Sequence, residues 1–287
     1  MTIITQMLKK YNLKTIEETK NALKEVFQEV ILAGLSKTDF FSHAAFYGGT
    51  ALRIFYGLER FSEDLDFSLR TSDSSFALEK YLKPVEDALK SLGLNFAVTT
   101  KENTVHSTID SVFIKGNTKQ IFIAVFKDSE DYKKIIHNEK MVIKLEVDID
   151  PPPYANTELK YRLLPYPYQV RVYDMESLFA GKVHALIARK WDNRVKGRDL
   201  YDYIYYLSLN TKVNLKHLEA RLKQTKSISE NEVLTRELLI EILNKRFADI
   251  DYQAAKKDVI PFLKDQSVLE LWSPSFFKDI TINIITN

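Results

Sequence analysis

The chain of 287 residues contains no cysteine, which excludes disulfides, thiolate metal sites and cysteine nucleophiles. Any metal site must use carboxylates or histidines, and carboxylates suit hard divalent cations. No stretch approaches the roughly eighteen apolar residues of a membrane-spanning helix. The first twenty residues carry Lys9, Lys10 and Lys14 without a following apolar core. We therefore expect a cytoplasmic protein that does not engage a membrane.

The chain also has little net charge and few glycines. A formal charge of +2 gives no indication of nucleic-acid binding, which would need a local basic surface. Hydrophobic residues make up 45% and charged residues 28%, the composition of a folded globular protein. At this length we expect one large domain or two moderate ones. Only eight residues are glycine, and two of them stand together at Gly48 and Gly49.

Helical patterns open the N-terminal half and strand patterns follow. Residues 14–35 and 72–93 place apolar side chains at helical spacing, and the second helix should be kinked at Pro84 and ended by Gly93. Four short segments rich in β-branched and aromatic residues then predict strands of one mixed sheet. These segments are residues 94–100, 106–114, 119–126 and 140–150.

A proline-rich segment separates this half from a helical remainder. Residues 151–173 hold five of the eight prolines, which favours extended connections and edge strands. We predict an α+β protein with a mixed β-sheet and flanking helices in residues 1–150, a connection in 151–173, and a helical domain in 174–287.

Two aspartates alternate within the apolar run SEDLDFSL. In a strand this spacing places Asp64 and Asp66 on one face, and Leu65 and Phe67 on the other, against the core. Neighbouring like charges raise one another's pKa unless a cation joins them. The pair therefore predicts a site for Mg²⁺ or Mn²⁺, although such a pair alone is more often a solvated strand face.

The two adjacent glycines lie between a strand pattern, AAFY, and a helix pattern, TALRIFYG. Thr50 can cap that helix, and the backbone N–H groups of Gly48 and Gly49 can face an anion. A helix start that holds phosphate and an aspartate pair that holds the metal on that phosphate would form one site.

A third acidic segment is VIKLEVDID. Alternation places Lys144, Glu146, Asp148 and Asp150 on one face, so one carboxylate can complete the trio that two-metal phosphoryl transfer needs. Alternation does not separate Glu146 from Asp148. A solvated strand face is the simpler interpretation of this segment taken alone.

Cations gather in the segment AGKVHALIARKWDNRVKGRD. Lys182 and Arg189 project from similar directions on a helix, and Arg194, Arg198 and Asp199 follow. Such a cluster near a phosphate site would neutralise a triphosphate and the leaving pyrophosphate. A solvated helix end, whose dipole the cations complement, explains the same pattern.

The first two motifs resemble the nucleotidyltransferase superfamily related to DNA polymerase β. The resemblance lies in Gly48-Gly49-Thr50, followed after thirteen residues by Asp64-x-Asp66. It implies a nucleotidyltransferase-like sheet, with the helical domain closing over its cleft.

Residues 46–70 resemble more narrowly the AbiEii/AbiGii toxin family of bacterial type IV toxin–antitoxin and abortive-infection systems. In that family the helix start and the segment that here contains Arg60 and Ser62 belong to the active site. The C-terminal motif is also similar, with Lys182-x-x-Ala185 followed by Arg198-Asp199-x-x-Asp202. This implies that Lys182 contacts nucleotide phosphates and that Asp199 orients the basic groups or assists the reaction.

The resemblance implies a toxin that transfers a nucleotide from an NTP to an acceptor hydroxyl, with the 3′ end of tRNA as the expected acceptor. It also implies an antitoxin that opposes the toxin without necessarily binding it. The expected metal ligands are Asp64, Asp66 and Glu146, with Asp148 as the alternative third carboxylate. The expected phosphate-binding residues are Gly48, Gly49, Thr50, Arg60, Ser62, Lys182, Arg189 and Arg198.

Two other functions stay open at this point. A nucleotide-binding switch would bind GTP or another NTP with magnesium and act without transfer. A carboxylate-dependent nuclease would use the same acidic strands for two-metal hydrolysis, but it has no need of the glycine turn or Lys182.

Overall fold

The computed structural model describes residues 2–100, 108–126, 131–190 and 195–287. The chain divides into two compact units. The first, here called the sheet unit, comprises Met1–Ala51, Phe61–Pro151 and Leu159–Val172. The second, the helical unit, comprises Leu52–Arg60, Pro152–Glu158 and Tyr173–Asn287. Within the described ranges, we find no helix with the length and apolar character needed to span a bilayer.

A seven-stranded mixed sheet organises the first unit, in the order β3-β4-β5-β2-β1-β7-β6. The mixed sheet with flanking helices confirms the predicted fold class. Its strands are β1 (Ala44–Tyr47), β2 (Leu65–Leu69), β3 (Phe96–Thr100), β4 (Ile109–Asn117), β5 (Lys140–Asp148), β6 (Thr157–Arg162) and β7 (Tyr168–Tyr173). The extended character predicted for 151–173 corresponds to β6 and β7, with β6 at the sheet edge. Residues 101–107, which include the start of the predicted strand 106–114, lie outside the described part.

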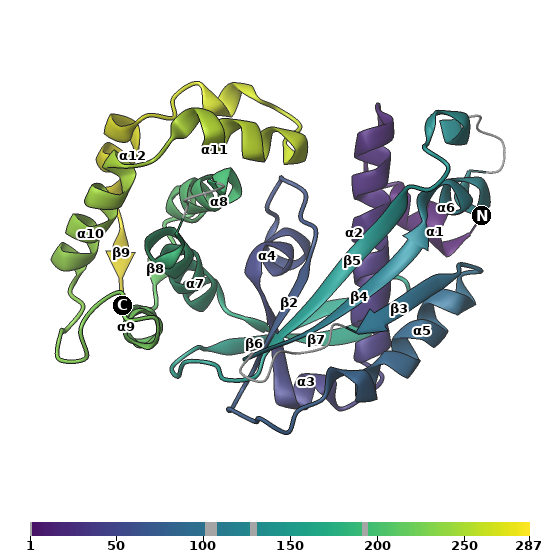
Figure 1. The fold of residues 1–287 in the computed structure, drawn as a ribbon, viewed down its shortest axis with the longest axis horizontal. Helices are drawn as coiled ribbons and strands as arrows, with labels where there is room; N and C mark the ends of the chain where they lie inside the picture. Colours follow the sequence, from purple (N-terminus) through teal and green to yellow (C-terminus); the bar gives the residue numbers. More distant parts are fainter. Residues whose placement is uncertain (1, 101–107, 127–130, 191–194) are drawn as a thin grey trace. The chain divides into compact units, whose positions relative to one another are not determined.

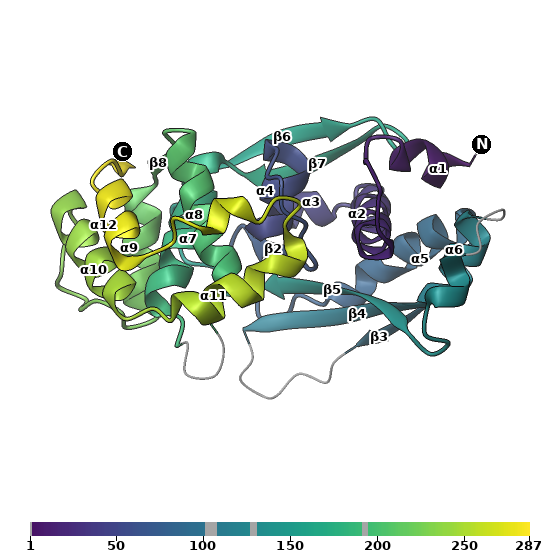
Figure 2. The ribbon, with the colours of Figure 1, turned by 90° about the horizontal axis from the view of Figure 1, so that it is seen from above.

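Two helices cover one side of β3, β4 and β5. They are α2 (Ile16–Leu35) and α5 (Leu82–Ser91), and both lie on the same side of these strands in Figures 1 and 2. A Cβ at Gly34 would lie 3.0 Å from the Val85 backbone, so glycine permits the close approach of α2 to α5. The alternating apolar side chains of β2 and β5 are buried on this side of the sheet.

Helix α2 begins at the capping pattern formed by Thr15 and Glu18. The Thr15 hydroxyl accepts a hydrogen bond from the Glu18 N–H at 3.1 Å, and the Glu18 carboxylate accepts one from the Thr15 N–H at 2.9 Å. This reciprocal capping box satisfies two N–H groups that the helix itself cannot.

Two local predictions were wrong. Residues 119–126, expected as a strand, form helix α6 (Thr118–Val125), which the Asn117 side chain caps at the Gln120 N–H. Its apolar run is too short for periodicity alone to separate helix from strand. In the 72–93 segment, α5 begins only at Leu82, so Pro84 lies in the first turn, where its missing N–H removes no intrahelical hydrogen bond.

Smaller elements complete the N-terminal part. They are α1 (Ile3–Leu8), α3 (Phe40–His43), α4 (Gly48–Tyr56) and the short 3₁₀ turns η1 (Leu78–Tyr81) and η2 (Asp131–Lys134). Gly93 follows α5 with φ +73°, so the predicted glycine stop is confirmed.

Six helices form the C-terminal part of the helical unit as described. They are α7 (Met175–Ala188), α8 (Gly197–Ser208), α9 (Leu215–Gln224), α10 (Arg236–Ala248), α11 (Tyr252–Val259) and α12 (Pro274–Thr281). Shorter elements are η3 (Ile260–Phe262), η4 (Ser267–Leu269), and a parallel pair of β8 (Lys212–Val213) with β9 (Ile285–Thr286). An aromatic core joins the helices: Phe179 stacks on Tyr206 at 4.7 Å, and Phe247 lies 5.1 Å from Phe277.

Candidate active site

The glycine turn and the second aspartate meet at the ends of β1 and β2. The strands are antiparallel, with Tyr47 opposite Asp66, and the chain then turns at Gly48 with φ +79° into α4. A Cβ at Gly48 would lie 2.5 Å from Asp66 Oδ2. Both the backbone conformation and the close approach therefore require glycine, and the Asp66 carboxylate lies against the start of α4.

A buried hydroxyl ties the same turn to the chain that leads into β2. Thr50 Oγ1 donates a hydrogen bond to the Asp64 backbone oxygen at 2.5 Å. Asp64 is half-buried and precedes β2 by one residue. The predicted capping role of Thr50 is wrong: Thr50 is the third residue of α4, and its hydroxyl holds the turn against the chain that leads into β2.

The register of β2 with β5 distinguishes the two candidate third carboxylates. These strands are parallel, and Asp66 pairs with Glu146 whereas Asp148 pairs with the buried Ser68. Paired residues on adjacent strands share a face of the sheet, so Glu146 is the direct neighbour of Asp66. The Lys144 ammonium lies 2.6 Å from Glu146 Oε1.

Carboxylate oxygens are ligands that divalent cations such as Mg²⁺ prefer, and Asp66 brings one to the start of α4. Among the residues that the structure describes, no three or more His, Cys, Asp or Glu side chains are close enough to hold a metal ion. The expected trio of Asp64, Asp66 and Glu146 is therefore not preassembled. Mg²⁺ commonly uses one or two protein carboxylates and completes its shell with water and substrate phosphates. Carboxylate oxygens beside a helix start fit that requirement.

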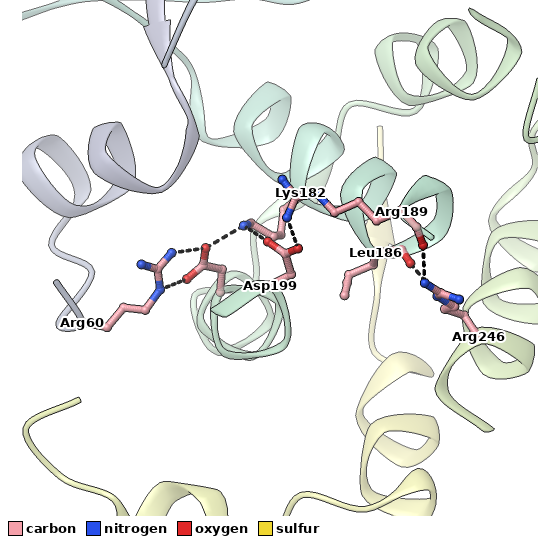
Figure 3. Close-up of polar contacts among 7 residues, drawn as sticks. Arg60, Lys182, Leu186, Arg189, Asp199 and Arg246 are labelled. Atoms are coloured by element: carbon pink, nitrogen blue, oxygen red, sulfur yellow. Dashed lines mark hydrogen bonds and ion pairs between the residues drawn. The ribbon is translucent and has the colours of Figure 1, made fainter. Parts of the chain in front are cut away.

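A second charged group lies entirely within the helical unit, and we call Arg60, Lys182, Arg189, Asp199 and Asp202 the ion network. Arg60 donates from Nε and from its terminal nitrogen to the two Asp202 oxygens, each at 2.6 Å. Lys182 Nζ lies 2.6 Å from Asp199 Oδ1 and 2.8 Å from Asp202 Oδ2. Arg189 also donates to Asp199. Figure 3 shows Lys182 and Arg189 converging on Asp199.

Most of the ion network is inaccessible to solvent. The side chains of Arg60 and Asp202 are 3% and 0% exposed, and Lys182 is 12% exposed, whereas Arg189 is 49% exposed. Burial alone would raise the pKa of the Asp199 carboxyl, but Lys182 and Arg189 outweigh it and hold that pKa below its ordinary value. Three cations face two carboxylates, which leaves one net positive charge.

One contributor to this region was missed from the sequence. Arg246 donates to the carbonyl oxygens of Leu186 at 2.9 Å and Arg189 at 2.5 Å, which satisfies the C-terminal end of α7 (Figure 3). An arginine 57 residues from Arg189 carries no local signal of this contact.

Two further predicted residues, Arg198 and Ser62, contact other parts of the chain. The Arg198 guanidinium lies 4.2 Å from the centre of the Phe262 ring. The backbone oxygen of Ser62 accepts a hydrogen bond from Gln28 Nε2 at 3.1 Å. Arg194 lies outside the described residues.

Comparison with known proteins gives one family and several structures of low identity. A crystal structure of JHP933 from Helicobacter pylori is 19% identical, covers 92% of this chain and 88% of its own, and has a TM-score of 0.46. A second H. pylori structure, provisionally described as a nucleotidyltransferase, is 19% identical, covers 95% and 97%, and has a TM-score of 0.49. No curated protein matches the chain.

The family model matches most of the sequence. It is described as nucleotidyl transferase AbiEii toxin of a type IV toxin–antitoxin system, and it spans residues 30–277. That range contains the glycine turn, the strand carboxylates and the ion network. The family also implies a cognate antitoxin. The chain therefore belongs to the AbiEii family of nucleotidyltransferase toxins.

Proposed function

We propose that this protein is a cytoplasmic toxin that transfers a nucleoside monophosphate from an NTP to the 3′ hydroxyl of an RNA acceptor, with tRNA as its target. The observation that carries the proposal is the contact between the Asp66 carboxylate and the Gly48 turn at the start of α4. It brings a cation-binding oxygen to a backbone that can bind phosphate. Glu146 on the adjacent strand adds a second carboxylate to the same face.

At the α-phosphorus the transfer forms one bond and breaks one, and the acceptor hydroxyl loses its proton. The acceptor oxygen attacks the α-phosphorus, the bond from that phosphorus to the α–β bridging oxygen breaks, and pyrophosphate leaves with the electron pair. The hydroxyl proton passes to a strand-end carboxylate or to water. Bound Mg²⁺ would neutralise phosphate charge and lower the pKa of the attacking hydroxyl, with Asp64, Asp66 and Glu146 as its protein ligands.

The remaining residues either bind phosphate or hold the phosphate-binding residues in place. The N–H groups of Gly48 and Gly49 bind phosphate oxygens, and Thr50 keeps their turn fixed against β2. In the ion network, Lys182 and Arg189 contribute phosphate-neutralising charge, and Asp199 orients both cations. Arg189 is the more exposed of the two, so it is the one that can exchange a carboxylate contact for phosphate with little desolvation.

Arg60 has a supporting role in this scheme. It donates from Nε and from a terminal nitrogen to Asp202, which also contacts Lys182. Arg60 therefore acts through Asp202 on the position of Lys182. The type IV class implies a cognate antitoxin that opposes the toxin without necessarily binding it.

The test is incubation of the purified protein with Mg²⁺, total bacterial tRNA and each α-labelled NTP in turn, followed by a denaturing gel. We expect labelled RNA with one or more NTPs, loss of label in EDTA, and no label with Asp64→Asn. NTP binding without labelled RNA would favour the nucleotide-binding switch, and shortened RNA would favour the nuclease.

A further inference from the structure

The carboxylate face of the sheet continues into a patch with an aromatic ring and two lysines. Phe113 on β4 lies opposite Thr99 of β3 and opposite Lys144 of β5. Lys115 follows two residues along β4, so it projects from the same face. The ammonium groups of Lys115 and Lys144 lie 5.3 Å and 5.8 Å from the centre of the Phe113 ring. We call Phe113, Lys115 and Lys144 the aromatic patch.

This patch is accessible and adjoins the proposed reaction centre. Thr99 is exposed, Phe113 and Lys115 are half-buried, and the Lys144 side chain is 30% exposed. Lys144 also contacts Glu146 at 2.6 Å, so one residue links the ring to the carboxylates. An aromatic ring with ammonium groups beside it can stack on an unpaired nucleobase while the ammonium groups contact its phosphates.

The strand order assigns the patch to the acceptor and not to the NTP. Along the order β4-β5-β2-β1, the carboxylates Glu146 and Asp66 lie between Phe113 and the glycine turn that follows β1. Phosphoryl transfer places the attacking oxygen and the leaving oxygen on opposite sides of the phosphorus. If the triphosphate binds the glycine turn on the β1 side, the attacking hydroxyl arrives from the β4 side.

We propose that the aromatic patch binds the single-stranded end of a nucleic-acid acceptor and positions its terminal hydroxyl toward the strand carboxylates. This inference rests on the proposed nucleotidyl transfer. Phe113 stacks on an unpaired base, and Lys115 and Lys144 contact the phosphates on either side of it. These are positioning residues, because they contact the acceptor strand away from the reacting atoms.

The binding test uses the full chain without NTP and a fluorescently labelled single-stranded RNA 12-mer of mixed sequence. Phe113→Leu should weaken binding at least about fivefold, because a leucine fills the space but removes the stacking face. Phe113→Trp should restore it. Lys115→Ala should weaken binding and reduce the slope of log K against log salt by about 0.7. Lys90→Ala on α5, which covers the other side of the sheet, is the matched charge control.

A second measurement separates this proposal from the transfer reaction itself. In the transfer assay, Phe113→Leu should raise KM for RNA at least about fivefold and leave KM for the NTP unchanged. Transfer with an unaltered acceptor KM would overturn the patch and leave nucleotidyl transfer standing. RNA binding that depends on Phe113 without any transfer would support the patch and overturn the proposed function. Equal RNA binding by Phe113→Leu and the unmodified protein, or a weakened NTP affinity instead, would also overturn the patch.

Discussion

The two charged clusters of this chain balance their charges in different ways. In the ion network each carboxylate has two cationic partners, and Asp199 and Asp202 are almost fully buried. At the ends of β2 and β5, Asp64, Asp66 and Glu146 are only half-buried. Buried charges are tolerated only when they are closely compensated, whereas partly solvated carboxylates can await a ligand.

This difference separates two uses of charge in one protein. The ion network connects α7 and α8 to Arg60, and its most buried pair, Arg60 and Asp202, is expected to contribute chiefly to the structure of the helical unit, whereas Lys182 and Arg189 are also expected to supply charge for phosphates. The strand carboxylates stand on a rigid sheet beside a glycine turn and are expected to contribute chiefly to chemistry. Four changes test the comparison, in order of decreasing expected effect.

Replacing a strand carboxylate should affect activity far more than stability. We expect Asp66→Asn to lower nucleotidyl transfer about 1000-fold or more, because several kcal/mol of transition-state stabilisation would depend on the metal that we propose it binds. Its free energy of unfolding should stay within about 1 kcal/mol of the unmodified protein, because Asp66 is half-buried. Labelled-RNA kinetics and urea unfolding measure the two effects, with Asp87→Asn on α5 as control. Retained transfer in Asp66→Asn would contradict the assignment.

Breaking the ion network should affect stability far more than activity. Asp202→Ala leaves the buried Arg60 and Lys182 with too little negative charge, and we expect it to destabilise the helical unit by about 3–5 kcal/mol. Urea unfolding followed by tryptophan fluorescence measures this loss. Asp87→Ala, which removes an exposed ion pair with Lys83, should leave the midpoint unchanged. An Asp202→Ala protein as stable as the control would show that the network is not structural.

The helical unit should lose stability in mild acid. Burial and the nearby Arg221 charge lower the pKa of His217 to about 4, whereas an unfolded histidine titrates near 6.5. Between these values the unfolded chain takes up a proton that the folded chain does not. His217 should therefore contribute a fall in stability of about 1.4 kcal/mol per pH unit as pH drops from about 6.5 to 4, in addition to any contribution from His184, whose pKa burial also lowers. His217→Gln should flatten this part of the curve of unfolding free energy against pH, and an unchanged slope would exclude His217 as its source.

Two glycines at positive φ provide the smallest and most selective test. Gly48 and Gly93 have φ of +79° and +73°, so alanine at either position should cost about 1–2 kcal/mol. The two positions differ in their surroundings: a Cβ at Gly48 would meet Asp66, whereas nothing lies within 4 Å of a Cβ at Gly93. We expect Gly48→Ala to lower transfer at least about tenfold and Gly93→Ala to leave it unchanged. Equal activity of the two variants would show that Asp66 does not depend on the turn.

Local signals predicted much of the fold. The capping box of Thr15 and Glu18, the alternation of β5 and the glycine stop after α5 are each set within a few residues. The helix α6 was not predicted because its short apolar run fits both the helical and the strand periodicity. The Asn117 cap favours the helix. Local sequence patterns of this kind predict individual helices and strands more reliably than they predict which helices and strands pack together.

The sites needed information that no local pattern contains. Alternation treats Glu146 and Asp148 alike, and only the register of β5 against β2 shows which one lies beside Asp66. The Arg60–Asp202 pair joins residues 142 positions apart, so its burial and its partner are properties of the folded chain. Motif spacing indicated that these residues matter but not whether they bind a ligand or one another.

The most direct test of the central claim follows the two ends of the NTP separately. The protein, Mg²⁺ and tRNA are incubated in parallel with α-labelled and γ-labelled samples of the same NTP, for the unmodified chain and for Asp66→Asn. Nucleotidyl transfer at the strand carboxylates predicts α-label on RNA and γ-label in pyrophosphate, with both signals lost in Asp66→Asn. Label that stays in intact NTP, or the same products from both proteins, would contradict the account.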